Sequence, residues 1–233
     1  MGVGARIGIL GDIITNWLVK VKVFIWNKIK KGYDRNIMEI VFATKNKGKI
    51  KELKHLVKDL EIIILSLEDI NFNEEILENG KTYSENAMHK AKEISKFSNK
   101  IALADDSGIE ILAYNNGPGV KSSRFSPELS YKQKNRKIIA DLKGLTGAER
   151  SAKFICAIAI YTPGGKSFIC KAECKGLISH APVGKNGFGY DPIFFLPEYD
   201  KTFAELHIKT KNKISHRAKA FKKARKILVC LTR

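Results

Sequence analysis

The sequence is poor in cysteine and proline. Its 233 residues include only four cysteines and six prolines. No two cysteines form a CxxC pair, and no histidine stands at zinc-like spacing from them, which excludes the common zinc modules and a disulfide framework. Nothing in this pattern calls for an oxidising compartment, and we therefore expect a cytoplasmic protein.

Acidic residues are also under-represented, since 24 aspartates and glutamates stand against 42 lysines and arginines, for a formal net charge of +18. Such a surplus favours anionic partners, including nucleotides, nucleic acids and anionic membranes. The lysines are spread along the chain instead of forming blocks, so a general lysine-rich composition accounts for most of the charge. RRM, KH and OB signatures are absent, and we expect no nucleic-acid partner.

Long uninterrupted hydrophobic runs are missing as well. The most apolar stretch lies in residues 1–37, where a helical stripe is interrupted by Asp12, Lys20 and Lys22, so we predict neither a transmembrane span nor a signal peptide. Two interpretations stay open for this basic amphipathic extension. We favour a non-native leader produced by a start codon assigned too early; the alternative is a helix lying in a membrane interface.

From Met38 onwards, apolar patterns of strand and helix type alternate. A Thr162–Gly165 turn signal joins two strand-like runs and makes the expected sheet mixed. We predict one α/β domain over residues 38–233, with a mixed, elongated central sheet and flanking helices. The expected strands are 38–43, 62–65, 101–104, 109–114, 153–161 and 166–173, and the expected helices are 47–58, 82–97, 130–142 and 213–231.

The segment TKNKGK follows a strand and opens a helix. Backbone N–H groups at a helix start bind anions, and Gly48 lets the backbone approach a ligand. The spacing is not that of a Walker A loop, and a solvated turn is the plain alternative. The segment consists of Thr44, Lys45, Asn46, Lys47, Gly48 and Lys49.

The segment ADDSG places Asp105 and Asp106 at the expected carboxyl end of a buried strand. Adjacent strand residues point to opposite faces, so we expect only one carboxylate to face a ligand, where it would suit Mg²⁺. Glu78 is either a second metal ligand or a favourable charge at a helix start. Other acidic residues compete for that role, namely Glu74, Glu75 and Glu85.

Two further segments complete the pattern. GFGYDPIF, residues 187–194, holds an aromatic ring between two glycines and is typical of the lip of a pocket. KNKISHR, residues 211–217, gathers several hydrogen-bond donors at the expected start of the last helix, where an arginine suits a phosphate or a carbonyl edge.

In this order, the four segments resemble the inosine triphosphate pyrophosphatase family, the non-canonical purine nucleoside triphosphate pyrophosphatases. The resemblance covers about residues 38–231 and includes PGVKSSRFS (118–126), FICAIAI (154–160) and KTFAEL (201–206). It implies a fold in two lobes with the active-site cleft between them, a homodimer and Mg²⁺. It also implies hydrolysis of ITP, dITP and XTP to the monophosphate and pyrophosphate.

The same resemblance implies roles for residues. Asp106 would be the catalytic carboxylate, and Glu78 and Asp106 would hold the metal. His216 and Arg217 would donate to the purine 6-carbonyl, which adenine lacks. Lys121 and Lys153 depart from the family pattern. The substrate-binding residues would be Thr44, Lys45, Asn46, Lys47, Gly48, Lys49, Ser107, Phe188, Gly189, Tyr190, Asp191, Lys211, His216 and Arg217.

Two alternatives stand beside this interpretation. One is a related nucleotide pyrophosphatase that acts on modified pyrimidine triphosphates. The other is an RNA-binding module that uses the positive charge without turnover. We expect no membrane attachment of residues 38–233.

Deleting residues 1–37 should leave Mg²⁺-dependent ITP hydrolysis intact, because every matched motif begins after Met38. Pyrophosphate release by the full and truncated chains, each verified as folded by circular dichroism, measures this. Inactivity of a soluble, folded truncation would show that the extension completes the site or the dimer.

Overall fold

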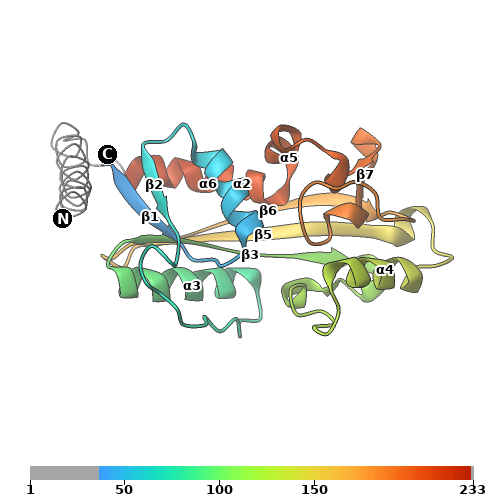
Figure 1. Ribbon diagram of the computed structural model, residues 1–233, viewed down its shortest axis with the longest axis horizontal. Helices are drawn as coiled ribbons and strands as arrows, with labels where there is room; N and C mark the ends of the chain where they lie inside the picture. The colour runs from blue at the N-terminus through green and yellow to red at the C-terminus, as the bar shows by residue number, and fades with distance from the viewer. Residues whose placement is uncertain (1–36, 232–233) are drawn as a thin grey trace, which may run out of the picture. The chain divides into compact units, whose positions relative to one another are not determined.

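One mixed sheet of eight strands organises the fold in the computed structural model, which describes residues 37–231 (Figure 1). The extension expected over residues 1–37 lies, apart from Ile37, outside the described residues. No helix within 37–231 combines the length and apolarity needed to cross a bilayer.

The strands follow the spatial order β2-β1-β3-β5-β6-β7-β8, and β4 pairs separately with β3. β1 runs parallel to β2 and β3, whereas all other pairs are antiparallel. The sheet is therefore mixed, as predicted. The strands are β1 Met38–Phe42, β2 Ile62–Leu65, β3 Ile101–Ile111, β4 Gly117–Pro118, β5 Ser151–Tyr161, β6 Ser167–Ile178, β7 Phe194–Leu196 and β8 Lys201–Thr202.

Helices cover both faces of this sheet, and the mixed α/β architecture predicted from the sequence is confirmed (Figure 1). α3 lies on one face, and α2 and α6 lie on the other. The main helices are α2 Lys47–Val57, α3 Tyr83–Ser98, α4 Tyr131–Asp141, α5 Ile208–Ile214 and α6 His216–Leu231. Short 3₁₀ turns are η1 Leu112–Tyr114, η2 Gly119–Lys121, η3 Gly147–Arg150, η4 Asp191–Ile193, η5 Pro197–Tyr199 and η6 Phe203–Glu205.

Side-chain caps explain where three of these helices begin. Asn46, Thr82 and Ser130 each precede a helix and accept a hydrogen bond from the backbone N–H three residues later, at 3.1, 3.2 and 3.4 Å. Such a cap satisfies one of the N–H groups that a helix start leaves unpaired. The cap at Asn46 fixes the start of α2 directly after β1, within TKNKGK.

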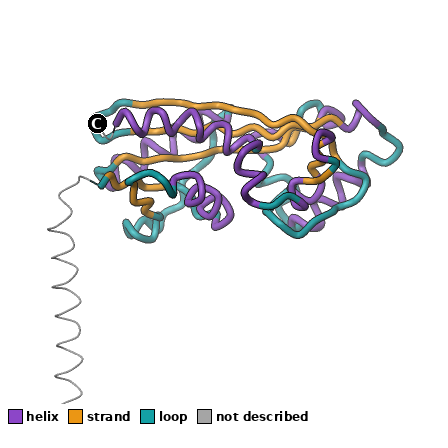
Figure 2. Tube along the Cα trace, turned by 90° about the horizontal axis from the view of Figure 1, so that it is seen from above, coloured by secondary structure: helices purple, strands orange, loops and turns teal. Residues whose placement is uncertain are grey.

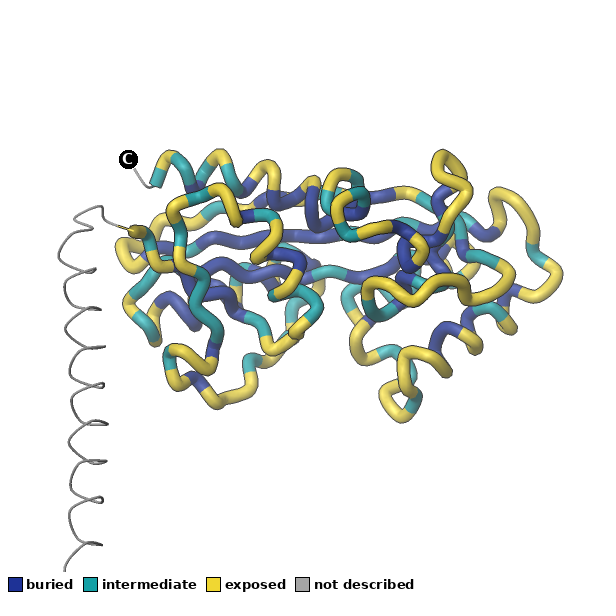
Figure 3. Tube along the Cα trace, turned by 45° about the horizontal axis from the view of Figure 1, so that its top comes forward, coloured by how far each residue is buried: buried dark blue, intermediate teal, exposed yellow. Residues whose placement is uncertain are grey.

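The long strands β3 and β5 are buried over most of their length, whereas much of β6 is exposed (Figures 2 and 3). Along β5, Cys156, Ile158 and Ile160 pack towards α2 and α6, whereas Ala157 and Ala159 pack towards α3. This alternation follows the two-residue period of a strand. Farther along the same strands, a separate aromatic core gathers around Phe154, Phe194 and Phe203.

The prediction of two strands interrupted by ADDSG is wrong, because β3 is one continuous strand. β5 pairs with it residue by residue from Ala102 to Ile111, which satisfies the backbone through the whole motif. β1, in contrast, pairs with β3 only as far as Leu103. The carboxylates of ADDSG therefore lie in mid-strand, just beyond the carboxyl end of β1.

The prediction of one helix over 213–231 is also wrong, because the chain breaks at Ser215. This residue is extended, with φ −67° and ψ 155°, and its hydroxyl accepts from the N–H of Ala218 at 3.2 Å. The capping serine ends α5 and starts α6. KNKISHR consequently spans two helices, and Lys211 lies on α5 while His216 and Arg217 open α6.

Gly108→Ala should lower the free energy of unfolding by about 1–3 kcal/mol, the usual cost of overpacking. A Cβ atom at this position would lie 2.3 Å from the carbonyl oxygen of Gly119 and 2.6 Å from the Ser122 hydroxyl. Urea unfolding measures the change. Gly164→Ala is the matched control, because a Cβ atom there meets nothing within 4 Å. Equal stability of the two variants would contradict the steric argument.

Candidate active site

A cavity of about 220 Å³ lies where β3, the loop between β1 and α2, the GFGYDPIF segment and the start of α6 converge. It brings together most of the substrate, catalytic and metal residues expected from the sequence. Those that line it are Thr44, Asn46, Lys49, Glu78, Asp106, Ser107, Phe188, Gly189, Tyr190, Asp191, Lys211, His216 and Arg217. Lys45, Lys47 and Gly48 do not line it.

Of the three lysines in the TKNKGK loop, only Lys49 lines the cavity. The ammonium group of Lys49 lies 3.1 Å from a carboxylate oxygen of Asp105. Lys45 instead donates to the carbonyls of Asn73 and Glu74, at 3.3 and 3.1 Å, so it stabilises a neighbouring loop. Lys47 is exposed to solvent.

Gly48 contributes space. A Cβ atom at this position would lie 2.5 Å from the ring of Phe188, closer than any real contact. The loop and the aromatic lip can touch only because residue 48 has no side chain.

A buried network of charges holds the cations at the cavity wall. Lys211 lies 2.7 Å from Glu52 and 2.5 Å from Asp191, and Arg217 pairs with Glu52 and, at 3.2 Å, with Asp105. All five residues are buried. Burial alone would raise the pKa of Glu52, but the attraction of Arg217 and Lys211 outweighs it and lowers that pKa.

The two carboxylates of ADDSG have opposite environments, as the strand alternation predicted. Asp105 contacts cations from α2 and α6, and they outweigh its burial and lower its pKa. Asp106 accepts a hydrogen bond of 3.0 Å from the amide of Asn86 on α3. Burial raises the pKa of Asp106, which Lys90 only partly opposes. Asp106 is therefore the more basic carboxylate and the one that lines the cavity.

Lys90 is a site residue that the sequence reasoning missed. Its ammonium group donates to Glu78 at 2.5 Å and to the backbone carbonyl of Asp105 at 2.9 Å. Burial disfavours its charged form, but the attraction of Glu78 and of both aspartates prevails and raises its pKa. Asn86 and Lys90 are buried polar residues four positions apart on one face of α3, a spacing that could have flagged them.

Glu52 was missed for a similar reason. It is buried on α2 beside Leu53 and three residues after Lys49. A carboxylate on the inward face of an otherwise amphipathic helix was the available signal.

The donor set for a metal is small. Within residues 37–231, no cluster of three or more histidine, cysteine or acidic side chains could enclose an ion. Asp106 and Glu78 nevertheless both line the cavity, where the negative charge of Glu78 acts to raise the pKa of Asp106. A cation would relieve this repulsion, and Mg²⁺ commonly uses only one or two carboxylates together with water and substrate phosphates. The residues present fit such an ion.

The aromatic lip is held by polar anchors. The Asp191 carboxylate accepts from the N–H of Phe188 at 2.8 Å, and the Tyr190 hydroxyl donates to the Ser122 carbonyl at 2.6 Å. Phe188 lies over two cations, with Lys211 5.2 Å and Arg217 5.4 Å from its ring centroid. Its ring therefore forms part of the charged wall.

His216 is a neutral ring packed against the aromatic core. It stacks on Phe154 with a centroid distance of 4.6 Å and an interplanar angle of 12°. Burial, together with the charge of Arg217, holds its pKa well below 6.5. Its Nδ1 atom is buried without a hydrogen-bond partner, so a polar group remains for a ligand to satisfy.

Comparisons with known proteins find clear relatives of this chain. The model of the Ham1 family matches residues 40–227. The chain is 44% identical over 192 residues to a dITP/XTP pyrophosphatase of Desulforamulus reducens, covering 82% of this chain and 96% of the relative. It is 44% identical over 191 residues to the Bacillus subtilis protein of the same name, with the same coverage.

Solved structures are similar as well. A HAM1 protein from Coxiella burnetii superposes with a TM-score of 0.75 at 39% identity, covering 82% of this chain and 98% of that one. The Staphylococcus aureus Ham1 protein gives a TM-score of 0.72 at 35% identity, covering 82% and 97%.

Glu52→Ala should lower the free energy of unfolding by about 3–5 kcal/mol, because it leaves Lys211 and Arg217 buried with fewer partners. Urea unfolding at neutral pH measures this. The pKa of Glu52 is lowered in the fold, so its contribution is present above pH 4.5 and fades as the pH falls below that ordinary value. The gap between wild type and variant should shrink accordingly.

Asp59→Ala is the control for that experiment, because Asp59 forms an exposed ion pair of 2.7 Å with Arg225. Exposed pairs contribute little to stability, and we expect almost no change. Similar losses in both variants would show that burial of the Glu52 network is not what matters.

Proposed function

Because this chain belongs to the Ham1 family, we propose that it is a nucleoside triphosphate pyrophosphatase acting on non-canonical purine nucleotides. It hydrolyses ITP, dITP and XTP to the monophosphate and pyrophosphate. The observation that carries this proposal is that the Asp106 carboxylate and a set of fixed cations line the same cavity. The relatives named dITP/XTP pyrophosphatase support the substrate class.

The triphosphate would lie against the TKNKGK loop and the adjoining cations. Thr44, Asn46 and Lys49 line this end of the cavity, and Lys90 stands beside the carboxylates. Their charges would stabilise the negative charge that builds up on the leaving pyrophosphate. The cavity of about 220 Å³ is smaller than the usual ligand site, so the lip at Phe188 must open for a nucleotide to enter.

Asp106 would act on the attacking water. Its carboxylate lines the cavity, whereas that of Asp105 is neutralised by Lys49 and Arg217. Hydrogen bonds from the Asn86 amide and the Ser107 N–H, at 3.0 and 2.9 Å, orient the Asp106 carboxylate. The role of Asp105 is then to position the two cations.

Mg²⁺ is the proposed cofactor, with Asp106 and Glu78 as its protein ligands. When bound, it supplies positive charge to the phosphates and lowers the pKa of coordinated water. Lys90 and Glu78 form an ion pair beside this position, which keeps the Glu78 carboxylate ionised and oriented.

Base recognition is assigned to His216 and Arg217. The Nδ1 atom of the neutral His216 has no hydrogen-bond partner. The guanidinium group of Arg217 is held in place because its Nε donates to Asp105 and its Nη2 donates to the Ser107 hydroxyl. A donor aimed at a purine 6-carbonyl would meet the amino group of adenine donor to donor, which accounts for selection against ATP.

The quaternary and cellular context rests on the family resemblance alone. We propose a homodimer in the cytoplasm. Hydrolysis of modified pyrimidine triphosphates is the less favoured alternative, since the named relatives are purine enzymes.

Asp106→Asn should reduce kcat for ITP by well over tenfold while the protein stays folded, because the neutral amide lacks the negative charge that would hold the cation and orient the attacking water. Pyrophosphate release from ITP, XTP, dITP, GTP, ATP and modified pyrimidine triphosphates, with and without Mg²⁺, measures function and substrate class together. Asp141→Asn, an exposed aspartate paired with Lys137, is the control and should keep full activity.

A loss of kcat smaller than tenfold amounts to less than about 1.4 kcal/mol and would remove Asp106 from the chemistry. Turnover of pyrimidine substrates without turnover of ITP would overturn the purine assignment. Absence of turnover on every triphosphate would overturn the enzyme proposal.

A further inference from the structure

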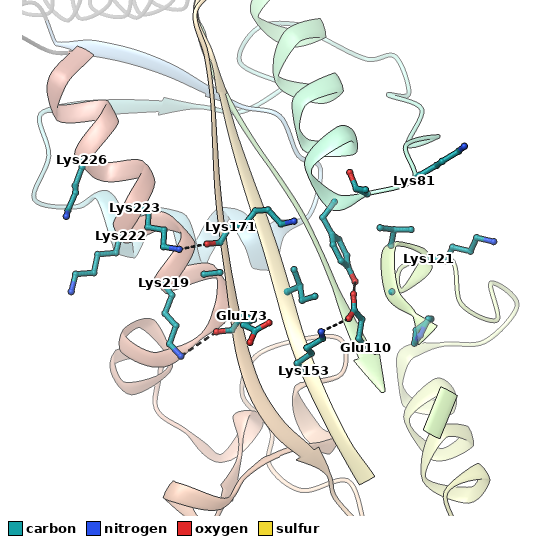
Figure 4. A pocket seen from close by; sticks show the side chains of 17 residues that line it. Lys81, Glu110, Lys121, Lys153, Lys171, Glu173, Lys219, Lys222, Lys223 and Lys226 are labelled. Carbon is teal, nitrogen blue, oxygen red and sulfur yellow. Dashed lines mark hydrogen bonds and ion pairs between the residues drawn. The ribbon is translucent and has the colours of Figure 1, made fainter. Parts of the chain in front are cut away.

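A second cavity is larger than the first, and most of the charged residues that line it are lysines (Figure 4). Its volume is about 1210 Å³, and none of its seventeen lining residues lines the candidate active site. Eight of the seventeen are lysines and two are glutamates. The lysines are Lys81, Lys121, Lys153, Lys171, Lys219, Lys222, Lys223 and Lys226.

These lysines come from segments far apart in the sequence. Lys219, Lys222, Lys223 and Lys226 recur along one side of α6, so that each turn of the helix presents at least one ammonium group. Figure 4 shows them on one side of the strands, with Lys81 and Lys121 on the other. The charge that is spread along the sequence is thus gathered here by the fold.

Part of this charge protects the edge of the sheet. β6 pairs with β7 only at Leu177 and Ile178, so its earlier residues form an edge. Lys223 donates to the carbonyl of Lys171 at 2.6 Å, and Lys219 to that of Glu173 at 3.5 Å. Lysines over a strand edge discourage pairing with another strand.

The remaining lysines are not explained by that role. Lys153 pairs with Glu110 at 3.1 Å, but the other five side chains have no carboxylate or carbonyl partner among residues 37–231. Five like charges left unpaired around one hollow favour an anion that can contact several of them at once. The five are Lys81, Lys121, Lys171, Lys222 and Lys226.

The lining also indicates what kind of anion fits. It contains no arginine, asparagine or glutamine, and its one aromatic ring, Tyr83, is buried with its hydroxyl bonded to Glu110 at 3.3 Å. Base stacking and edge reading need such groups, so the cavity has nothing to recognise a nucleobase. Lysine ammonium groups act as adaptable point charges for phosphate.

A second copy of the chain is a poorer occupant. A two-fold interface sets this surface against the same surface of the second copy, where eight lysines would meet only two glutamates.

We propose that this cavity binds linear inorganic polyphosphate, a chain of phosphates without sugars or bases. Its closely spaced charges can meet the ammonium groups of α6, β6 and the Lys81 and Lys121 loops together. Binding is independent of the proposed hydrolysis, because the two cavities share no lining residue.

The test is titration of the full chain with long-chain polyphosphate, without Mg²⁺, by isothermal calorimetry between about 50 and 200 mM salt. The triple variant Lys171→Glu, Lys222→Glu, Lys226→Glu should bind at least tenfold more weakly. For this variant, the plot of the logarithm of the binding constant against the logarithm of the salt concentration should be shallower by about one unit of slope for each lost contact. Lys49→Ala, which alters only the active site, should retain binding.

The matched control is Lys51→Glu, Lys92→Glu, Lys132→Glu. These lysines are exposed on α2, α3 and α4, and the change in net charge is the same. Equal losses of polyphosphate affinity in both triple variants would show that net charge alone explains binding, and would overturn the proposed site.

Two further outcomes would overturn the ligand. Single-stranded RNA that binds more tightly than polyphosphate, and loses binding in the same variant, would assign the cavity to nucleic acid. Conversion of a dimer to a monomer in the variant, seen by light scattering, would assign the surface to self-association.

Discussion

The buried contact of Glu52 with Lys211 and Arg217 is the interaction on which the site depends. One carboxylate from α2 holds cations that belong to α5 and α6, more than 150 residues away in the chain. Removing the charges from water is costly, and the cost is offset only because each has several partners in fixed geometry. The same constraint that joins the helices therefore also aims Arg217 and Lys211 at the cavity.

β3 places two adjacent carboxylates, Asp105 and Asp106, in different surroundings. Because consecutive residues of a strand face opposite ways, Asp105 meets the helices on one face and Asp106 meets α3 on the other. The environment then separates their pKa values, downwards for Asp105 and upwards for Asp106. Two identical side chains thus acquire opposite electrostatic properties.

Much of this was readable from the sequence because it is local. The strand at Ile62–Leu65, the α2 start after Asn46 and the hairpin between β5 and β6 follow from periodicity, capping and turn residues. The continuity of β3 was not readable, because β5, some fifty residues later, supplies its pairing. Nor was the break at Ser215, since a single capping serine inside a helical pattern has no distinct periodicity.

The lining of the candidate cavity was predicted to a similar degree. Motif residues such as Asp106, Phe188 and Arg217 were found because their types and order carry the resemblance. Glu52, Asn86 and Lys90 were missed, because a polar residue on a buried helix face shows its purpose only once its partner is known. Lys45 belongs to the motif but turns to neighbouring carbonyls, a detail decided by the loop at Asn73.

The absence of a side chain at Gly48 has a mechanical meaning. The TKNKGK turn touches the ring of Phe188 at the cavity wall, with no space between them for even a methyl group. The turn and the ring therefore limit each other's position. A side chain at residue 48 would push this ring away from Lys211 and Arg217, so one contact sets both the shape of the turn and the position of the ring in the charged wall.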